Sequence, residues 1–436
     1  MKIKRLLDWL DNSTCNFLAV DTIRKELENA GFSELDPAKS WTLKKGSRHF
    51  ITKNDSAIFA FIAGEKSPAE TGFRIISAHS DSPCFKIKPN AEIYGDGGVV
   101  SLNVEKYGGG ILYTWFDRPL SISGRVMIAG NDPLHPVCRL VDLKRPVAFI
   151  PHLAIHFNRA VNEGNSLSVQ KDMKPVVGYF NDETIKEQKA NGGIVKILIA
   201  DHLGIRPEDI LEYELCLYPL EPASTAGVNN EYLQSARIDD LSMAYAGLEA
   251  LLNAADKPAD YTRVLAVFDN EETGSGTKQG AASPVLAEMM QRISAAFDAN
   301  PQEDYFRAVA NSFMISADDA HAWHPNYNEK YDPTNHPVIG GGPVIKINAN
   351  CKYMTDAQGA AVFRSLCDKA GVKCQYFVNH SDVAGGSTLG NILTSQIPLK
   401  GVDMGCAIWA MHSARETAGV TDHFDTVSVF STFFGS

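Results

Sequence analysis

The sequence lacks the features that mark membrane-spanning, nucleic-acid-binding or disulfide-stapled proteins. No stretch reaches the roughly 18 to 20 apolar residues that a membrane helix needs, and neither Lys nor Arg forms a long run. With a net charge of −11, a nucleic-acid or membrane partner is not expected. The eight cysteines contain no CxxC pair, which argues against a structural zinc cluster and a disulfide framework. We expect them to be reduced and buried as small hydrophobic residues.

The first residues, MKIKRLLDWLDN, are partly basic but do not form the apolar core of an export signal. Asp8, Asp11 and Asn12 interrupt the apolar positions. The pattern is instead typical of an amphipathic helix that opens a folded domain. We therefore expect a cytoplasmic protein.

The length of 436 residues, with 44% hydrophobic residues, predicts two domains, or one domain with an insertion. Near both ends, apolar strands alternate with helical patterns, which predicts an α/β fold with a mostly parallel sheet and helices on both faces. The middle is rich in Gly, Pro and short alternating segments, which predicts a β-rich unit with one helix near residues 206–211. The expected division is 1–92 and 226–436 for the α/β domain, and 93–225 for the insertion.

Five places put metal-ligand residue types just after an apolar strand or beside a Gly-rich turn. In open α/β sheets ligands bind at such strand ends. The five places are His79-Ser80-Asp81, Asp239-Asp240, Glu271-Glu272, Asp318 and His412. Two His and three or more carboxylates suit zinc, or manganese or cobalt, better than copper or an iron–sulfur cluster. Each motif alone is weak, but together they predict a metal centre.

The spacing within two motifs suggests a division of roles. His79 and Asp81 share one face of an extended chain, so the carboxylate can accept a bond from the imidazole nitrogen that does not bind metal. Glu271 and Glu272, if extended, point in opposite directions, so that one binds metal and the other accepts a proton from water. The alternatives are a Ser-Asp-Pro surface turn for the first motif and a solvated acidic turn for the second.

The remaining motifs leave more than one interpretation open. Asp239-Asp240 precedes a helix, where acidic residues also serve as caps. Asp318 competes with Asp319 and with two nearby histidines, His321 and His324. His412 follows the apolar run CAIWA and has a glutamate four residues on.

These motifs together resemble the aspartyl aminopeptidase family, the M18 metallopeptidases, and suggest a bacterial member. The stretches that carry the resemblance are AHSDSP, IPHLAIHFNR, ARIDDL, FDNEETGSGT, SADDAHAWHPNY, VIKINANCKYMTD and MHSARE. The resemblance implies a metalloaminopeptidase with two divalent ions, zinc first and manganese or cobalt as alternatives. It also implies peptide substrates, a β-rich dimerisation domain inserted in the catalytic domain, and assembly into tetrahedral dodecamers.

Carried over by motif, the resemblance implies roles for individual residues. The implied metal ligands are His79, Glu272, Asp318 and His412, with Asp239 bridging the two ions and Glu271 as the general base. A non-proline cis peptide is expected between Asp239 and Asp240. The match selects Asp318 over Asp319, and implies that the two neighbouring histidines are structural or support the metal ligands from behind. Where relatives have Asp-Asn, this chain has Asp-Asp, and its loop DVAGGSTLG also departs from theirs, which leaves the substrate pocket open.

Two further assignments concern the substrate. Lys346, in VIKIN, matches a position that meets the substrate side chain, which predicts a preference for acidic N-terminal residues; the alternative is a lysine paired with a nearby carboxylate. His156 looks like a core histidine on an apolar strand, but the resemblance implies that it reaches from the inserted domain of one subunit into the catalytic pocket of another.

Two other functions stay open at this point. A deacylase or carboxypeptidase on a similar fold would need a cation for the substrate carboxylate, which Arg237, Lys346 or Arg415 could provide. A non-catalytic metal-binding scaffold would keep the ligands without the activity, but retention of both Glu271 and Glu272 disfavours it.

Overall fold

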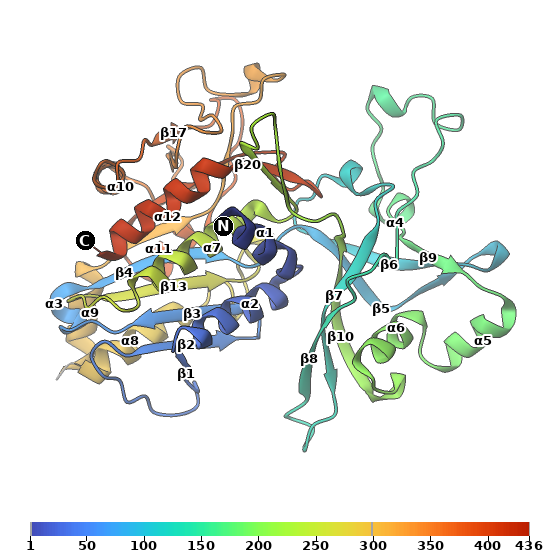
Figure 1. Ribbon diagram of the computed structural model, residues 1–436, viewed down its shortest axis with the longest axis horizontal. Coiled ribbons are helices and arrows are strands. Elements are labelled where there is room, and N and C mark those ends of the chain that lie inside the picture. The colour runs from blue at the N-terminus through green and yellow to red at the C-terminus, as the bar shows by residue number, and fades with distance from the viewer. Residues whose placement is uncertain (1, 298–299, 436) are drawn as a thin grey trace. The chain divides into compact units, whose positions relative to one another are not determined.

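The computed structural model describes residues 2–297 and 300–435, and the chain forms two compact units (Figure 1). The first unit contains the chain up to Asp81, Ala223–Met411 and the part from Glu416 onward. The second contains Ser82–Pro222 and His412–Arg415. The chain thus passes between the units at 81/82, 222/223, 411/412 and 415/416, whereas the sequence texture suggested two crossings, at 92/93 and 225/226.

A nine-stranded mixed sheet forms the centre of the first unit. Its strands, in order across the sheet, are β1 (Ser33–Glu34), β2 (Arg48–Lys53), β3 (Ala57–Ile62), β13 (Thr262–Phe268), β4 (Phe73–His79), β14 (Phe313–Ala317), β18 (Lys400–Gly405), β16 (Val344–Lys346) and β17 (Gln375–Phe377). The middle strands β13, β4, β14 and β18 are mutually parallel, while β2–β3, β3–β13 and β18–β16 pair antiparallel. The expected α/β class is confirmed, and β2 and β3 form a hairpin that turns after Lys53.

Side-chain alternation along the strands divides the core into two layers. In β13, Leu265 and Val267 pack on one face, and Val264, Ala266 and Phe268 pack on the other. The first face is covered by α1 (Lys2–Asn12), α2 (Asn16–Asn29), α7 (Ile238–Ala254), α10 (Ala357–Ala370) and α12 (Val420–Gly435). The second face is covered by α8 (Val285–Phe297), α9 (Pro301–Asn311) and α11 (Leu389–Gln396), with the short α3 (Pro68–Thr71) beside α9. Strands with period-two alternation thus bury both faces, as a sheet between helices requires.

A second, smaller sheet of the first unit brings distant segments together. Its order is β11 (Ser224–Ala226), β12 (Tyr232–Ser235), β20 (Glu416–Gly419), β19 (Ala407–Trp409) and β15 (Ala320–His321). Ser235, which lies just before the chain enters α7, pairs with Glu416, the first residue of β20. This pairing brings Glu416 close to the start of that helix.

The second unit is built on a six-stranded antiparallel sheet, which agrees with its expected β-rich character. The order is β8 (Val137–Asp142), β7 (Leu120–Ile128), β10 (Ile210–Pro219), β5 (Cys84–Tyr94), β6 (Val99–Tyr107) and β9 (Val176–Tyr179). Helices α4 (Val169–Asp172), α5 (Asp182–Ala190) and α6 (Ile194–Leu203) complete it.

The expected helix at residues 206–211 is wrong. A short 3₁₀ helix occupies Pro207–Asp209, and β10 begins at Ile210. The two longer helices of this unit, α5 and α6, lie earlier in the chain, and their residue patterns did not indicate helices. Helix α5 is mostly polar and begins at the cap of Asn181, whose side chain accepts the Thr184 N–H at 2.8 Å, whereas α6 is mostly apolar and resembles a buried strand.

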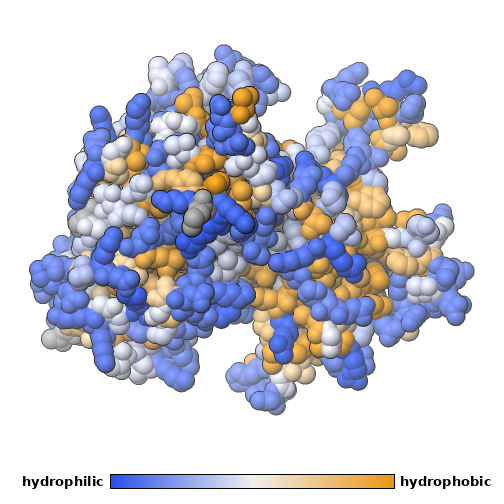
Figure 2. Space-filling model, in the orientation of Figure 1, coloured by the Kyte–Doolittle hydropathy of each residue, from blue (hydrophilic) through white to orange (hydrophobic). Residues whose placement is uncertain are grey.

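Exposed apolar side chains are common on the second unit, as Figure 2 shows on the face that it displays. They include Ile111, Tyr113, Leu134, Phe149, Leu153, Ile155, Phe157, Tyr179 and Leu211. In the part of the chain that the structure describes, no helix combines the length and apolar character needed to cross a membrane.

Candidate active site

The carboxyl ends of three adjacent parallel strands bring the predicted ligands to one edge of the central sheet. His79 is the last residue of β4 and is in register with Phe268, the last residue of β13. Glu271 and Glu272 follow β13, and Asp318 follows β14, on the other side of β4. The location matches the general rule for ligand sites in open α/β sheets.

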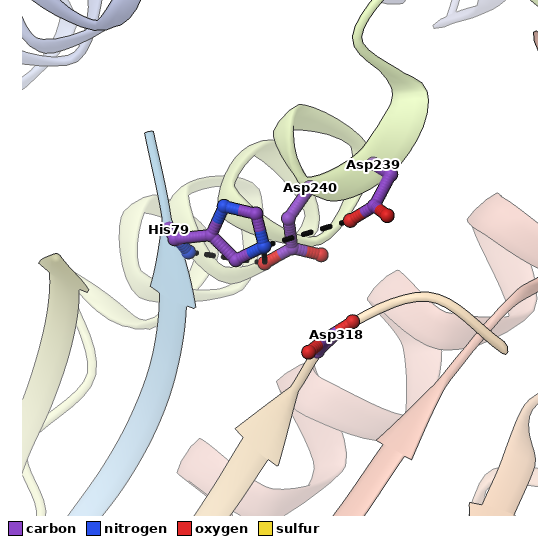
Figure 3. A group of neighbouring side chains, drawn as sticks. All are labelled: His79, Asp239, Asp240 and Asp318. Atoms are coloured by element: carbon purple, nitrogen blue, oxygen red, sulfur yellow. Dashed lines mark hydrogen bonds and ion pairs between the residues drawn. The ribbon is translucent and has the colours of Figure 1, made fainter. Parts of the chain in front are cut away.

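Figure 3 shows how His79 and three aspartates converge. One atom from each of His79, Asp239, Asp240 and Asp318 can be chosen so that all four lie within 4.8 Å of one another. The His79 Nε2 atom is 3.5 Å from Asp239 Oδ1 and 4.0 Å from Asp240 Oδ2. All four residues are buried. Such a concentration of buried oxygen and nitrogen ligands is suited to a divalent cation.

The first turn of α7 presents the two neighbouring aspartates. The backbone at Asp239 has φ −77° and ψ 109°, so regular helix begins only beyond this residue. The Asp239–Asp240 peptide bond is cis, as the resemblance predicted. The Asp239 N–H donates to Glu416 Oε2 at 3.1 Å, and the His79 N–H donates to Asp240 Oδ2 at 3.0 Å. Glu416 thus holds the backbone of Asp239, whereas the carboxylate of Asp240 holds the backbone of His79.

Asp81 ties the strand end of His79 to the segment after β13. Its Oδ1 accepts the Glu271 N–H at 3.1 Å, and its Oδ2 accepts the Glu272 N–H at 3.2 Å. The His79 Nδ1 atom is 3.0 Å from the Asp81 carbonyl oxygen and 3.4 Å from Asp81 Oδ1. The imidazole is therefore oriented mainly by the backbone of Asp81, while its carboxylate positions the glutamates.

Glu271 and Glu272 do not lie on extended backbone, so the expectation that they point in opposite directions for that reason is wrong. They form a single 3₁₀ turn that ends at Thr273, preceded by Asn270 with φ 62°. An atom of each carboxylate can lie within 4.8 Å of a His79 ring nitrogen. The turn places both glutamates at the same site, and any division of roles depends on their side chains.

Burial and crowding strongly affect ionisation in this cluster. Burial, together with the nearby carboxylates of Asp318 and Asp239, raises the pKa of Glu271 to about 8. Burial and neighbouring acids also raise the pKa of Asp240 and of Glu272 well above the usual range. A divalent cation would reverse this repulsion and favour the ionised carboxylates.

The His79 imidazole responds in the opposite way. Burial alone opposes its protonation, but the carboxylates of Asp240, Asp239 and Asp81 outweigh burial and raise the pKa of His79 well above its ordinary value. The Oδ1 atom of Asp240 is buried, with no hydrogen-bond partner among the described residues. The cluster has more hydrogen-bond acceptors than donors, and a bound metal ion would satisfy the acceptors that remain. The residues therefore fit a bound cation.

The structure distinguishes Asp318 from Asp319. The Asp319 carboxylate accepts the Ser242 hydroxyl at 2.8 Å and the Cys406 N–H at 3.1 Å. The Asp318 carboxylate joins His79 and Asp239 instead, and its Oδ1 lies 3.3 Å from Lys346 Nζ. The Asp319 carboxylate is thus occupied by hydrogen bonds within the fold, whereas the Asp318 carboxylate faces the other residues of the candidate metal cluster.

Some of the predicted residues do not join this cluster within the first unit. His321 is exposed and lies edge-on to Phe377, with ring centroids 5.7 Å apart, and the His324 ring is tilted against Tyr327, with ring centroids 5.0 Å apart. His412 groups with the second unit, where its Nδ1 is 3.2 Å from the Gly109 carbonyl oxygen. Its role as a ligand remains a prediction.

The expected strand at His156 is wrong. His156 lies in a turn, exposed, between Ile155 and Phe157, whose exposed fractions are 52% and 81%. Pro151 has no N–H to donate to a strand ladder, which accounts for the end of pairing after Ile150.

Comparison with known proteins identifies the family. The family model described as Aminopeptidase I zinc metalloprotease (M18) matches residues 9–434. The chain belongs to the M18 family. This M18 chain is 46% identical over 429 residues to a probable M18 family aminopeptidase 2 of Clostridium novyi, covering 98% of this chain and 97% of that protein. It is a zinc metalloaminopeptidase, as the resemblance implied.

Solved M18 structures share the fold over almost the whole chain. A structure of an Ape4 and Nbr1 complex matches with a TM-score of 0.94 and 34% identity, covering 98% of this chain and 84% of the other. A structure of the Saccharomyces cerevisiae mApe1 dodecamer matches with a TM-score of 0.87 and 27% identity, covering 99% and 96%. The M18 fold is thus established independently of the local motifs.

Two residues at this M18 site were missed as contributors from sequence. Glu416 was noted only as a neighbour of His412, yet it is buried and holds the backbone of Asp239. Asp240 was treated as the second member of a pair, yet it binds the backbone of His79. No local pattern signals either role, because both depend on long-range contacts between α7, β4 and β20.

Proposed function

We propose that this aminopeptidase binds two divalent ions, zinc by preference and manganese or cobalt as alternatives, and removes single residues from the N-termini of peptides. The proposed ligands are His79, Asp239, Glu272, Asp318 and His412, with Asp239 shared between the ions. The observation that carries the proposal is the buried convergence of His79 with Asp239, Asp240 and Asp318 at the strand ends. Asp240 is assigned to holding the backbone of His79.

Bound metal ions at such a site lower the pKa of water and polarise a carbonyl oxygen. The chain supplies the rest of the chemistry. Glu271 accepts the proton of the attacking water and returns it to the leaving amine. Asp81 keeps Glu271 in place through the bond to its backbone N–H, 3.1 Å long. A carboxylate that is fixed through its own backbone beside the metal ligands is well placed to carry a proton both ways.

The alternative deacylase or carboxypeptidase reaction is not favoured, because the matching family and the named relatives are aminopeptidases. The three candidate cations for a substrate carboxylate all have partners within the fold. Lys346 lies against Asp318, and Arg237 Nε donates to the Ser13 carbonyl oxygen at 3.1 Å. An Arg415 guanidinium nitrogen donates to the Pro222 carbonyl oxygen at 3.0 Å. Of these three contacts, only that of Lys346 involves a residue of the metal cluster, Asp318.

We also propose that the chain self-associates, as dimers through the β-rich unit and further into a tetrahedral dodecamer. Support comes from the exposed apolar side chains of that unit, among them Leu153, Ile155 and Phe157. Further support is the likeness to the mApe1 chain, whose structure is described as a dodecamer. Exposed apolar clusters of this kind mark interaction surfaces.

His156 is proposed to complete the active site of a neighbouring subunit. The residue is exposed in a turn that also exposes Ile155 and Phe157, as a group that serves another copy must be. An imidazole N–H directed at the substrate carbonyl oxygen would stabilise the developing negative charge. Mixing His156→Ala subunits with Glu271→Gln subunits should restore activity, because a mixed dimer regains one intact site. Failure despite proven subunit exchange would place His156 outside the reaction.

The proposed function is tested by metal reconstitution. Chelator-treated protein is refilled with zinc, cobalt or manganese and assayed on aminoacyl-anilides and on matched N-acyl-aminoacyl-anilides. We expect activity on the free-amine substrates alone, with a maximum near two ions per chain. Equal hydrolysis of the N-acyl substrates, or full activity at one ion per chain, would contradict the proposal.

A further inference from the structure

Two cysteines lie together at the end of α10, outside the candidate metal cluster. Cys367 is in the last turns of the helix and is fully buried, while Cys374 follows the helix, directly precedes β17 and is half-buried. The chain reverses between them at Gly371, which has φ 71°, and the Val372 N–H donates to the Cys367 carbonyl at 2.9 Å. Beyond this turn Cys374 packs against the hydrophobic cluster that contains Cys367, so that the two thiols interact with each other.

The surroundings of the two sulfur atoms differ. Cys374 lines an open surface hollow together with Arg364, Asp368 and Lys373. Cys367 instead packs in the main hydrophobic core. The Cys374 thiol is thus accessible from solvent beside two basic side chains, and the Cys367 thiol lies in the protein interior.

The same contact separates the acidities of the two thiols. The hydrogen bond from Cys367, assisted by the charge of Arg364, lowers the pKa of Cys374 to about 7, although burial acts against this. The hydrogen bond and burial both raise the pKa of Cys367. Cys374 is therefore the thiol with an appreciable thiolate fraction at neutral pH, and the thiolate is the reactive form of cysteine.

We propose that Cys374 and Cys367 form an oxidation site that reacts with hydroperoxides and closes to a disulfide, Cys374 being the attacking thiol and Cys367 the resolving thiol. An accessible reactive cysteine with a second thiol in contact is the arrangement of a reversible redox site. Both cysteines are free thiols and Cys367 is buried, in line with the expectation from sequence, and the proposal adds a chemical role for this pair.

The reaction balances with one hydroperoxide per disulfide. The Cys374 thiolate attacks a peroxide oxygen and the O–O bond breaks, so that this oxygen stays on sulfur as a sulfenic acid. The other oxygen takes up the proton that the Cys374 thiol released and leaves as water or an alcohol. The Cys367 sulfur then attacks the sulfenic sulfur, the S–O bond breaks, and water leaves with the Cys367 proton. Two thiols and one peroxide thus give one disulfide and two small neutral products.

The disulfide would join α10 to a strand near the active site. Residue Phe377 of β17 is in register with Lys346 of β16, the residue that contacts Asp318. The redox site is therefore one strand away from a proposed substrate-binding residue, without sharing any residue with the metal cluster.

The test uses the full-length, zinc-loaded protein and hydrogen peroxide. After a short exposure, remaining thiols are blocked by alkylation, and digested peptides are analysed by mass spectrometry. We expect a cross-linked Cys367–Cys374 peptide to form about tenfold or more faster than oxidation of the exposed Cys351, and dithiothreitol to remove the cross-link. Oxidation of Cys351 before any cross-link appears would overturn the proposal.

Serine variants separate the two roles. The Cys367→Ser protein should stop at a sulfenic acid on residue 374 that a dimedone probe captures, and Cys374→Ser should form no adduct at residue 367. The matched control Cys351→Ser should form the cross-link at the wild-type rate. A sulfenic acid at Cys367 in the Cys374→Ser protein, or over-oxidation of Cys374 in the wild type with no cross-link, would contradict the assignment.

Discussion

The Lys346 ammonium nitrogen lies 3.3 Å from Oδ1 of Asp318, and both residues are buried. Lys346 also donates to the Asp319 carbonyl oxygen at 3.1 Å. Burial on its own would disfavour the charged lysine, but the carboxylate of Asp318 reverses this and raises the pKa of Lys346. The pairing that we considered as an alternative from sequence therefore exists, and a role in substrate selection has to be tested beside it.

A substitution of Lys346 should separate the two roles. If the lysine meets acidic substrate side chains, Lys346→Met should lower kcat/KM for Asp and Glu substrates about 10- to 100-fold more than for Leu or Ala substrates. The measurement is a comparison of kcat/KM over an aminoacyl-anilide panel, with the exposed Lys352→Met as the matched control. An equal loss on all substrates would restrict Lys346 to its contact with Asp318.

A substitution of Asp81 tests whether its carboxylate positions Glu271 and Glu272. An asparagine has only one acceptor oxygen in its amide, so Asp81→Asn removes one of the two bonds to the Glu271 and Glu272 backbone and also a neighbouring negative charge. We expect kcat to fall about 10- to 100-fold. Because the Asp81 charge contributes to the raised pKa of Glu271, its loss should lower that pKa.

The pH profile distinguishes positioning from simple structural damage. A lower pKa of Glu271 should move the acidic limb of the pH–rate profile to lower pH in Asp81→Asn. The exposed Asp201→Asn serves as the control and should leave the profile in place. A reduced rate with an unmoved acidic limb would argue against electrostatic contact between Asp81 and Glu271.

The adjacent residues Asp318 and Asp319 form a matched pair for metal binding. Asp318→Asn removes a ligand charge and should weaken zinc binding about 10-fold or more. Asp319→Asn keeps a carbonyl oxygen for the Cys406 N–H, and the Ser242 hydroxyl can reorient, so it should retain its zinc. Zinc per chain after dialysis against limiting metal provides the measurement. The reverse order of zinc loss would mean that the ligand was assigned to the wrong residue.

The burial of His423, away from the active site, predicts that the free energy of unfolding depends on pH. It lies in α12, is 1% exposed, and stacks on Tyr245 with ring centroids 5.8 Å apart. Burial lowers its pKa from 6.5 to about 4. The unfolded chain therefore binds the proton more readily, and stability is fully present above pH 6.5 and declines as the pH falls towards 4. The full difference is about 3 kcal/mol, of which about 2 kcal/mol should be lost at about pH 5.

Urea unfolding of the metal-free protein checks this prediction. Between about pH 7.5 and pH 5, His423→Phe should lose about 2 kcal/mol less stability than the wild type. The exposed His202→Gln is the control and should lose as much as the wild type. The same loss in His423→Phe as in the wild type would show that this imidazole does not titrate as expected.

The strand-end ligands could be predicted because each follows an apolar segment. β4, β13 and β14 are nearly continuous runs of buried residues that end at His79, Asp269 and Asp318, so hydrophobic patterning alone located one edge of the sheet. Parallel neighbours then place these ends side by side.

Features that depend on long-range contacts could not be predicted. The local pattern left Asp318 and Asp319 equivalent, and only the family resemblance selected Asp318, because the contacts that occupy Asp319 come from Ser242 and Cys406, which are distant in sequence. The 3₁₀ turn of Glu271 and Glu272 is held by Asp81, and no local pattern indicates it. Helix α6 was missed because its apolar residues have no clear period that separates a buried helix from a strand.

The most direct test of the proposed mechanism is the rate of aminoacyl-anilide hydrolysis by zinc-loaded Glu271→Gln protein, measured with its zinc content. Glutamine keeps the shape of the side chain but cannot accept the proton of the attacking water. We predict that kcat falls by about 100- to 10,000-fold while zinc per chain stays at the wild-type level. Glu272→Gln should instead lose zinc. A Glu271→Gln enzyme that keeps its zinc and hydrolyses the substrate at close to the wild-type rate would contradict the proposed role of Glu271.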